Sequence, residues 1–477
     1  MGKLAKNYAY NVAYQLLVLI APLVTAPYLS RVLGAEALGA YAYINATGNV
    51  VATISLLGIY TYGNRQVAYV RDDRDALNKT FWELTALRSL LGVCGTLMYA
   101  VYAVWTKQYR SLFLVYYPYI LAQFIDCSWL YVGLEDMGPA VLKNFLAKVT
   151  NIAGIFLLVR SPDDVWIYLL LLASTTFIGN VCIYTQLPKY VGSPSVNIRN
   201  IPIHIKGSLQ LFLPQLAALF YLQVDKMMLQ WITGDSRQIS FYDQAEKIVT
   251  IPLSLITVIS TVMMPRIANE YHKDNAKVVS SLLCKSGQFS LCLALPMAFG
   301  VLCVAQQLIP WYLGEEFAPS AITIMVLSPI ILLNTLSGIS GKQYFIATGQ
   351  ISILTKAYLS AAVLNVLINA LLIPRYGFIG AAVATVMSGV LSVAGQYRYL
   401  HRQVELKDMW RNSVPYLFGA LLMALVLVAL TWKMKAQAWT TLLQVVIGIV
   451  VYFAYLVAIR DSLLKELILR IEKRRSI

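Results

Sequence analysis

The sequence has few charged side chains and no long polar stretch. Only 13% of its 477 residues are Asp, Glu, Lys or Arg, whereas 58% are hydrophobic, and the mean hydropathy is +0.64. A water-soluble chain of this length would fold into several domains and would need far more polar surface. The composition therefore excludes an ordinary soluble protein and indicates one that lies mostly within a membrane.

Residues that bind metals or form disulfides are scarce. The six cysteines all lie in apolar runs, and their spacing matches neither a metal site nor a disulfide framework. The three histidines are His204, His272 and His401, which are scattered and are expected to be solvated on the cytoplasmic side. The sequence therefore predicts no metal and no organic cofactor.

Motifs for bond-making chemistry are also missing from the sequence. The two Gly-Lys pairs, at 2–3 and 341–342, lack the upstream Gly and the following Ser or Thr of a phosphate-binding loop. Neither H-E-x-x-H nor G-x-S-x-G occurs. We therefore expect neither an enzyme nor ATP-driven transport by this chain alone.

What the sequence does contain is a succession of apolar runs. About fourteen of them, each of roughly 19 to 25 residues, are long enough to cross a ~30 Å hydrocarbon core as helices. The predicted spans are residues 10–29, 41–61, 83–105, 111–133, 141–159, 165–187, 207–231, 243–265, 284–305, 320–341, 355–374, 379–399, 412–432 and 438–459. The first run is longer than a signal-peptide core and no A-x-A site follows it, so we expect it to be a retained span. The pattern predicts an all-α integral membrane protein, and a chain so fully embedded is most often a transporter.

The net charge of +15 reflects orientation rather than a nucleic-acid partner. With the N-terminus inside, most of the 38 Lys and Arg residues fall on the cytoplasmic side of the predicted spans. The opposite topology would invert this basic bias, against the positive-inside rule. We therefore expect both termini to be cytoplasmic.

The connection at residues 188–206 divides the first twelve spans into two halves. It carries three prolines and lies between two groups of six spans. A weak sequence similarity between the two halves supports a parallel repeat. Gly34 and Tyr41 follow span 1 at nearly the same spacing as Gly234 and Tyr242 follow span 7. The predicted organisation is an N-terminal lobe at 1–187, a cytoplasmic linker at 188–206, a C-terminal lobe at 207–400, two further helices within 401–459 and a basic amphipathic cytoplasmic tail at 460–477.

Polar side chains inside spans are costly unless they find a partner or a water-filled cavity. The amides that recur on one helix face or lie in a repeat-leading span are candidates for lining a cavity: Asn45, Asn49, Gln215, Asn365 and Asn369. The alternative is hydrogen bonding between helices, which contributes only ~0.6 kcal/mol per contact on average. Both interpretations stay open for spans 2 and 11.

Charged groups in the spans are fewer and more informative. Asp126 and Asp225 are candidates for coupling transport to protons or sodium ions. For Arg31 and Lys247, near span ends, snorkelling to the interface is the simpler alternative.

Several ordered motifs resemble those of a known family. Residues 27–34, Pro-Tyr-Leu-Ser-Arg-Val-Leu-Gly, resemble the N-terminal signature of bacterial polysaccharide repeat-unit flippases of the multidrug/oligosaccharidyl-lipid/polysaccharide (MOP) exporter superfamily. Further motifs resemble those of the family and occur in the same order along the chain: Tyr-Gly-Asn-Arg at 62–65, Val-Asp-Lys at 224–226, Met-Pro-Arg at 264–266 and Ile-Pro-Arg-Tyr-Gly at 373–377. One departure is that Ser240 and Phe241 precede Tyr242, where many relatives have Gly-x-Tyr. The resemblance implies two pseudo-symmetric six-helix lobes plus two C-terminal helices, a MATE-like architecture.

The resemblance also implies a substrate and a setting. The substrate would be an undecaprenyl-pyrophosphate-linked oligosaccharide, moved from the inner to the outer leaflet of the bacterial cytoplasmic membrane for polymer assembly. A monomer would work in the bilayer, and the polymerase of the same pathway is a further candidate partner. Basic residues placed to bind the pyrophosphate in a cleft between lobes are Arg31, Arg65, Arg88, Lys226, Lys247 and Arg266. The competing class is a cation-coupled exporter of the multidrug and toxin extrusion (MATE) type, which shares the fold.

Overall fold

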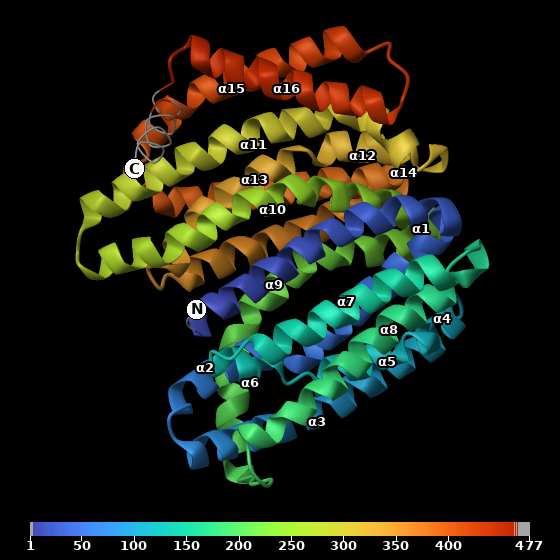
Figure 1. The fold of residues 1–477 in the computed structure, drawn as a ribbon, viewed down its shortest axis with the longest axis vertical. Helices are drawn as coiled ribbons and strands as arrows, with labels where there is room; N and C mark the ends of the chain where they lie inside the picture. The colour runs from blue at the N-terminus through green and yellow to red at the C-terminus, as the bar shows by residue number, and fades with distance from the viewer. Residues whose placement is uncertain (1–2, 462, 464, 466–477) are drawn as a thin grey trace. The chain divides into compact units, whose positions relative to one another are not determined.

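The computed structural model describes the backbone of residues 3–461, 463 and 465, and within them the regular structure is entirely helical. The helices of the first half are α1 (Lys3–Leu56), α2 (Ile59–Val70), α3 (Arg74–Trp105), α4 (Arg110–Val115), α5 (Tyr117–Ile125), α6 (Ser128–Gly133), α7 (Gly138–Leu158), η1 (Pro162–Asp164), α8 (Val165–Cys182), η2 (Ile183–Lys189), η3 (Ile198–Asn200) and α9 (Ile201–Thr233). Those of the second half are α10 (Ser236–His272), α11 (Ala276–Tyr312), η4 (Glu315–Phe317), α12 (Pro319–Leu327), α13 (Pro329–Ser337), η5 (Gly338–Ile346), α14 (Ile351–Leu400), α15 (Lys407–Thr431) and α16 (Ala438–Ala458) (Figure 1).

These helices account for the predicted spans. Helices α1 and α14 each contain two spans, α4 to α6 together form the fourth, and α12, α13 and η5 form the tenth. Among the described residues, 10 helical segments are long and apolar enough to cross a membrane. The expectation of an all-α membrane protein is therefore confirmed.

Two glycines separate the paired spans within α1 and α14. Gly34 has φ 74° and ψ 177°, and Gly377 has φ 52° and ψ −131°, so neither is helical. A side chain is strained at such positive φ values, which is why glycine occupies both positions. Both glycines belong to the sequence motifs at the ends of spans 1 and 11. Those motifs therefore provide the backbone conformation that separates the two spans of each helix.

The connection between the predicted spans 41–61 and 83–105 is largely helical. Helix α2 continues to Val70 and α3 begins at Arg74, so residues 71–73 separate the two helices. Asp73 caps α3, because its carboxylate accepts the backbone N–H groups of Asp75 and Ala76 at 3.0 and 3.1 Å. The charged residues of this connection are therefore compatible with helical structure.

The chain divides by its internal packing into two compact units, residues Met1–Ser240 and Phe241–Ile477. In the first unit α1 packs against α3, α7 and α9, and α8 packs against α5 and α7. The sequence placed residues 207–231 in the C-terminal lobe, whereas α9 packs against α1, α2 and α3 of the first unit. The relation of the two halves as repeats, with a boundary at 188–206, stays a prediction.

Aromatic side chains fill the core of the first unit around the predicted inner ends of its helices. Phe81 and Trp129 stack with ring centroids 5.4 Å apart, and Tyr131 is fully buried beside them. Gly63 allows this approach, because a Cβ atom there would lie 2.7 Å from the Trp129 ring. The Tyr-Gly motif at 62–63 therefore serves packing.

The second unit is built around α11, which contacts α12, α13, α15 and α16. Helices α15 and α16 pack against each other as well as against α11, as Figure 1 shows at its red end. Tyr416, Met423 and Tyr452 bury their side chains in this layer. The two C-terminal spans are thus integral to the packing of the second unit.

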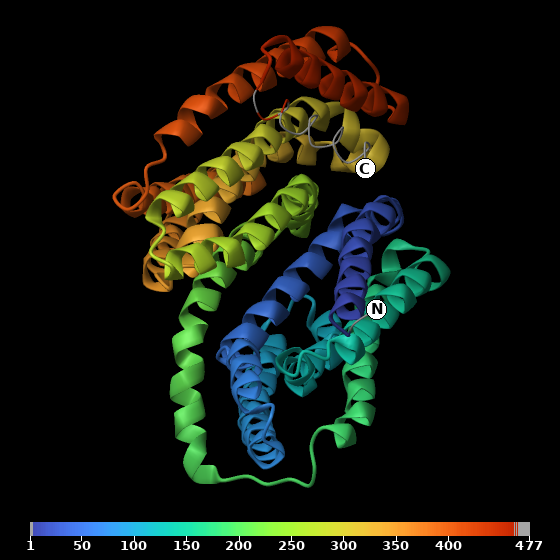
Figure 2. The same cartoon turned by 60° about the vertical axis from the view of Figure 1, so that its left-hand side comes forward.

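Residues 190–197 connect α8 and α9 as an extended segment along one end of the first unit (Figure 2). The indole of Trp82 donates to the carbonyl of Gly192 at 3.0 Å, and Asn78 bonds the backbone of Gly192 and Ser193 at 3.0 Å. Burial, and to a lesser extent the hydrogen bond to Asp136, raises the pKa of Tyr190, so its phenol remains a donor at neutral pH. The predicted linker is therefore held against α3 by specific bonds. The predicted amphipathic tail lies almost wholly outside the described residues.

Candidate functional site

The six basic residues predicted to bind pyrophosphate have different surroundings. Arg31, Arg65 and Arg266 are exposed, whereas Arg88 and Lys226 are buried and Lys247 is partly exposed. Arg31, Arg65, Arg88 and Lys226 lie in the first unit, and Lys247 and Arg266 lie on α10 in the second. Their convergence on one cleft stays a prediction.

Arg88 forms hydrogen bonds to the backbone of a neighbouring helix, α5. Its guanidinium donates to the carbonyls of Phe124 at 2.9 Å and Gln123 at 2.5 Å, at the C-terminal end of α5. These carbonyls lack partners within their own helix and carry partial negative charge, so a buried cation there is well placed. In this conformation Arg88 is committed to packing, and among the described residues its Nη1 atom finds no hydrogen-bond partner.

Asp126 belongs to a buried polar cluster between α5, α7 and α8. Its Oδ1 atom lies 2.6 Å from the ammonium of Lys143 and also accepts the hydroxyl of Ser128 at 2.5 Å. Lys143 donates as well to Asn180, whose amide in turn donates to the carbonyl of Ala122 at 2.7 Å. The sequence analysis missed Lys143 and Asn180, although both are polar residues within predicted spans and each could have been paired with Asp126.

The second acidic candidate for ion coupling, Asp225, lies on α9 beside Lys226. The Asp225 side chain is 1% exposed, so the carboxylate lies in the packed interior of the first unit. A role in ion coupling stays a prediction for both Asp126 and Asp225.

A second buried cluster joins α2, α3 and α9 on the predicted inner side. Glu83 lies 2.9 Å from Nε2 of His204 and accepts from Asn200 at 2.8 Å, while Nδ1 of His204 lies 3.1 Å from the hydroxyl of Tyr62. We expected His204 to be solvated, and this was wrong, because it is 8% exposed. No sequence spacing linked His204 to Glu83, since more than 100 residues separate them.

The amides of span 2 meet a pair of stacked tyrosines. The hydroxyl of Tyr116 donates to Asn45 at 2.8 Å, and that of Tyr119 donates to Asn49 at 3.2 Å. The two rings lie 4.6 Å apart and nearly parallel. In the same unit Gln215 donates to the hydroxyl of Thr61 at 2.7 Å. These partners show the interhelical hydrogen bonding that was the alternative to cavity lining.

The corresponding amides of the second unit are more deeply packed. Asn365 and Asn369 are 0% exposed, and Asn369 donates to Asn365 at 3.0 Å. Nearby, Gln343 lies in the π-helical turn η5 and bonds Ser260 at 3.0 Å and Ser286 at 2.6 Å. The lining of a cavity by Asn365 and Asn369 stays a prediction.

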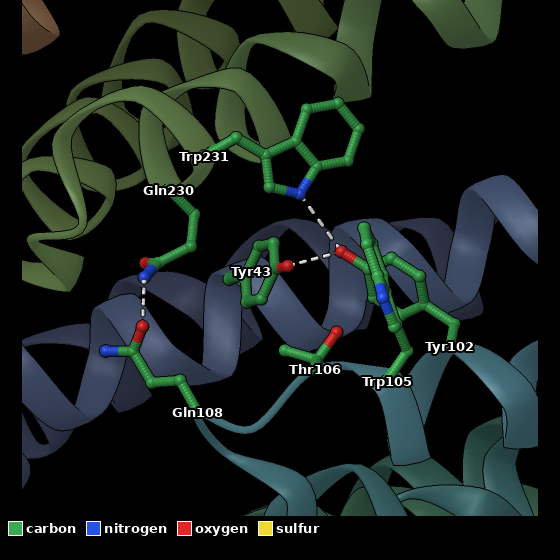
Figure 3. Close-up of a pocket in the computed structure, with 7 residues that line it drawn as sticks. All are labelled: Tyr43, Tyr102, Trp105, Thr106, Gln108, Gln230 and Trp231. Carbon is green, nitrogen blue, oxygen red and sulfur yellow. Dashed lines mark hydrogen bonds between the residues drawn. The ribbon is translucent and has the colours of Figure 1, made fainter.

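A pocket of about 200 Å³ lies at the end of the first unit where α3 and α9 finish. It is lined by Tyr43, Tyr102, Trp105, Thr106, Gln108, Gln230 and Trp231 (Figure 3). The indole of Trp231 donates to the hydroxyl of Tyr102 at 3.0 Å, and that hydroxyl also bonds the hydroxyl of Tyr43. No motif in the sequence indicated this pocket. The sequence feature that could have indicated it is the group of aromatic and amide residues at the ends of spans 3 and 7.

Comparison with known families gives the class of protein. The model of the family described as "Polysaccharide biosynthesis protein" matches residues 4–270, and that described as "Lipid II flippase MurJ" matches residues 141–450. Each match covers more than half of the chain. The chain belongs to the polysaccharide biosynthesis protein family. The resemblance found in the sequence motifs is therefore confirmed, and the matching families and relatives support the role of a membrane transporter.

Relatives of this family member match over most of their length. A "Putative O-antigen transporter" of Shigella dysenteriae is 24% identical over 376 residues, covering 78% of this chain and 93% of that protein. One of the same description from Escherichia coli (strain K12) is 23% identical and covers 80% and 92%. A "Probable low-salt glycan biosynthesis flippase Agl15" of Haloferax volcanii is 26% identical and covers 70% and 69%.

Solved structures share the fold. "Lipid II flippase MurJ, inward closed conformation" has a TM-score of 0.77 at 18% identity and covers 96% of this chain and 99% of its own. An inward-facing MATE family transporter of the MOP superfamily has a TM-score of 0.65 at 16% identity and covers 83% and 96%. At such identities the likeness establishes architecture alone, and it confirms the MATE-like fold expected from the sequence.

Proposed function

We propose that this chain is a flippase that moves an undecaprenyl-pyrophosphate-linked oligosaccharide from the inner to the outer leaflet for assembly of a surface polysaccharide. The observation that carries the proposal is the match to two putative O-antigen transporters over 92% or more of their length. A match of that extent leaves at most about 8% of either relative without a counterpart in this chain.

The energetics of the reaction fit a protein with polar groups inside its spans. A pyrophosphate and several sugars cannot cross hydrocarbon unaided, because an isolated ionised group there costs tens of kcal/mol in the Born limit. Cationic side chains would lower the cost for the pyrophosphate, and amide and aromatic side chains would do so for the sugars. The lipid tail would remain in the bilayer throughout.

Among the six candidate cations, the structure favours the exposed ones as phosphate partners. Arg31 donates to the carbonyl of Pro27 in its own helix, 3.0 Å away, and Arg65 lies 5.8 Å from the ring of Tyr62, and both residues are exposed. Arg266 is exposed on α10. Arg88 is committed to backbone carbonyls, so its substitution should impair folding more than substrate binding.

We further propose that transport proceeds by alternating access of two lobes in the bacterial cytoplasmic membrane, with both termini cytoplasmic. The breaks at Gly34 and Gly377 support this mechanism, because each gives a long helix a point at which its two spans can change direction. Coupling to protons or sodium ions would supply the energy.

The test is analysis of lipid-linked intermediates and surface polymer in a strain lacking the gene, with and without the wild-type gene. The proposal expects undecaprenyl-linked repeat units to accumulate on the inner leaflet and surface polymer to be lost, with both effects reversed by complementation. Normal polymer together with altered resistance to cationic compounds would instead indicate the drug-exporter class.

The same strain tests the cationic residues. Arg31→Ala, Arg65→Ala and Arg266→Ala should each reduce polymer output at equal membrane abundance, and the corresponding Lys variants should restore part of it. Arg411→Ala is the control, because Arg411 is a 70% exposed arginine paired with Asp408. Unchanged output in all three Ala variants would refute a role for these cations in substrate binding.

A further inference from the structure

The pocket at the ends of α3 and α9 contains a buried hydrogen-bond acceptor without a partner. Gln230 is 6% exposed, and its amide nitrogen donates to Gln108 at 3.0 Å. Its Oε1 atom is buried and accepts no hydrogen bond from the part of the chain that the structure describes. Leaving a buried acceptor unpaired is destabilising, so a site that retains one is prepared for a donor from a ligand or water.

The aromatic side chains of the pocket are held in fixed positions. Tyr43 is 2% exposed, and its hydroxyl bonds that of Tyr102, which in turn accepts the indole N–H of Trp231 (Figure 3). Trp105 follows Tyr102 by one helical turn and is 79% exposed. The pocket thus has a buried polar floor and two exposed indoles at its mouth.

The chemistry of the lining selects among the parts of a lipid-linked saccharide. All seven lining side chains are uncharged, so the pocket offers no cation to a pyrophosphate and no charge to a charged sugar. Against an isoprenoid tail the buried Oε1 atom of Gln230 would stay without a hydrogen-bond donor. A neutral sugar matches both features, because its hydroxyls donate and accept while its C–H face stacks on aromatic rings. The volume of about 200 Å³ suits one sugar residue rather than a whole repeat unit.

We propose that this pocket is a binding subsite for one uncharged sugar residue of the translocated oligosaccharide. The inference rests on the proposed flippase function and on the predicted topology, in which the ends of spans 3 and 7 face the outer surface. The Oε1 atom of Gln230 accepts a sugar hydroxyl or N-acetyl N–H, and the indole of Trp231 provides the stacking face. The subsite holds the glycan on the side of the membrane where it is delivered.

Exposed tryptophans near a membrane surface have a simpler role as interfacial anchors. An anchor requires only a position at the interface, whereas a sugar subsite also requires the acceptor of Gln230. Trp166 provides a matched control, since it is 46% exposed at the start of α8 on the same predicted surface and does not line the pocket. Anchoring therefore predicts equal effects of Trp166→Ala and Trp231→Ala, and the subsite predicts different ones.

The binding experiment uses the full-length protein in lipid nanodiscs. The first probe is the free oligosaccharide released by mild acid from the intermediate that accumulates in the deletion strain, and the second is undecaprenyl pyrophosphate without sugar. Tryptophan fluorescence of the wild type should change saturably with the oligosaccharide. Gln230→Leu should weaken that affinity about 10-fold, because it removes the acceptor and keeps both indoles, while affinity for undecaprenyl pyrophosphate stays unchanged.

The cellular experiment compares polymer output at equal membrane abundance. Trp231→Ala and Gln230→Leu should each lower surface polymer several-fold and retain intermediate in the cell, whereas Trp166→Ala should match the wild type. Oligosaccharide binding by Gln230→Leu that equals that of the wild type would overturn the subsite, and so would equal losses in Trp166→Ala and Trp231→Ala.

These results are separable from a failure of the proposed function. If the wild-type gene does not restore polymer to the deletion strain, the flippase proposal is wrong and the subsite falls with it. If the wild type restores polymer and the pocket variants behave like it in both experiments, only the subsite is wrong.

Discussion

Replacing Lys143 with Met should strongly destabilise the first unit. The Lys143 and Asp126 side chains are only 7% and 19% exposed, and their charged atoms lie 2.6 Å apart. After the substitution the Asp126 carboxylate keeps the hydroxyl and backbone N–H of Ser128, at 2.5 and 3.1 Å, but loses its hydrogen-bonded cation. Breaking one side of a buried ion pair costs about 3–5 kcal/mol, because it leaves an uncompensated buried charge.

The reverse substitution tests the same pair from the other side. Asp126→Asn leaves the Lys143 ammonium with Asn180 as a neutral partner, so it should also destabilise the unit. The double variant removes both charges, and its loss of stability should be smaller than the sum of the single losses by about 0.5–3 kcal/mol. That difference is the signature of direct coupling between the two residues.

The assay is thermal unfolding of the purified protein in one detergent, followed by intrinsic fluorescence. A loss of 3–5 kcal/mol corresponds to a fall in the unfolding midpoint of roughly 6 to 20 °C for a unit of this size. Arg71→Met is the control, because it breaks a 2.7 Å ion pair with Glu135 whose members are 38% and 66% exposed, and solvent screens such pairs. Its midpoint should stay close to that of the wild type.

The same variants decide between a packing role and ion coupling for Asp126. Midpoints within about 2 °C of the wild type for both single variants, or strictly additive losses, would refute the reasoning. If Asp126→Asn instead kept its stability and changed the dependence of transport on pH or sodium, the carboxylate would belong to the coupling machinery.

Three further substitutions test how local geometry supports the fold. Gly34→Ala should destabilise the protein by about 1–3 kcal/mol in the same assay, because φ is 74° at this position. Gly179→Ala is the control and should be nearly neutral, because its new Cβ would make only ordinary van der Waals contacts. Gly39→Ala should lower the yield of folded protein measured by size-exclusion chromatography, since its Cβ would lie 1.8 Å from a backbone carbonyl oxygen of α10; an unchanged elution profile would contradict this contact. His204→Ala should cost about 1–3 kcal/mol more than Glu83→Gln in thermal unfolding, because it leaves a buried carboxylate short of a partner, and equal losses would argue against the bond.

The sequence predicted the spans well because length and hydropathy set what can cross a bilayer. All fourteen predicted spans have a helical counterpart, including those that α1 and α14 combine. The same criterion did not identify most of α2, because residues 62–70 lie outside the predicted spans. Hydropathy reports burial in lipid, and it says little about helicity in a segment that lies outside the hydrocarbon.

Individual polar residues were less predictable than the spans. Asp126 was recognised as costly within a span, but its cation, Lys143, is 17 residues away on another helix. Asn45 and Asn49 were placed on one helix face correctly, whereas the tyrosines that bond them come from α4–α5, about 70 residues later. A helical period identifies a face, but it carries no information about which distant helix packs against that face.

The sequence by itself determined that this chain is an all-α membrane transporter of the polysaccharide biosynthesis family, because hydropathy and ordered motifs are local properties. Only the tertiary structure decided which polar groups are satisfied within the fold, and that the Oε1 atom of Gln230 is not satisfied by the described residues. It grouped Arg88 with the end of α5, His204 with Glu83, and Gln230 with a pocket of aromatic residues. Such partnerships depend on distances between helices that are far apart in the chain, and no periodicity in one segment encodes them.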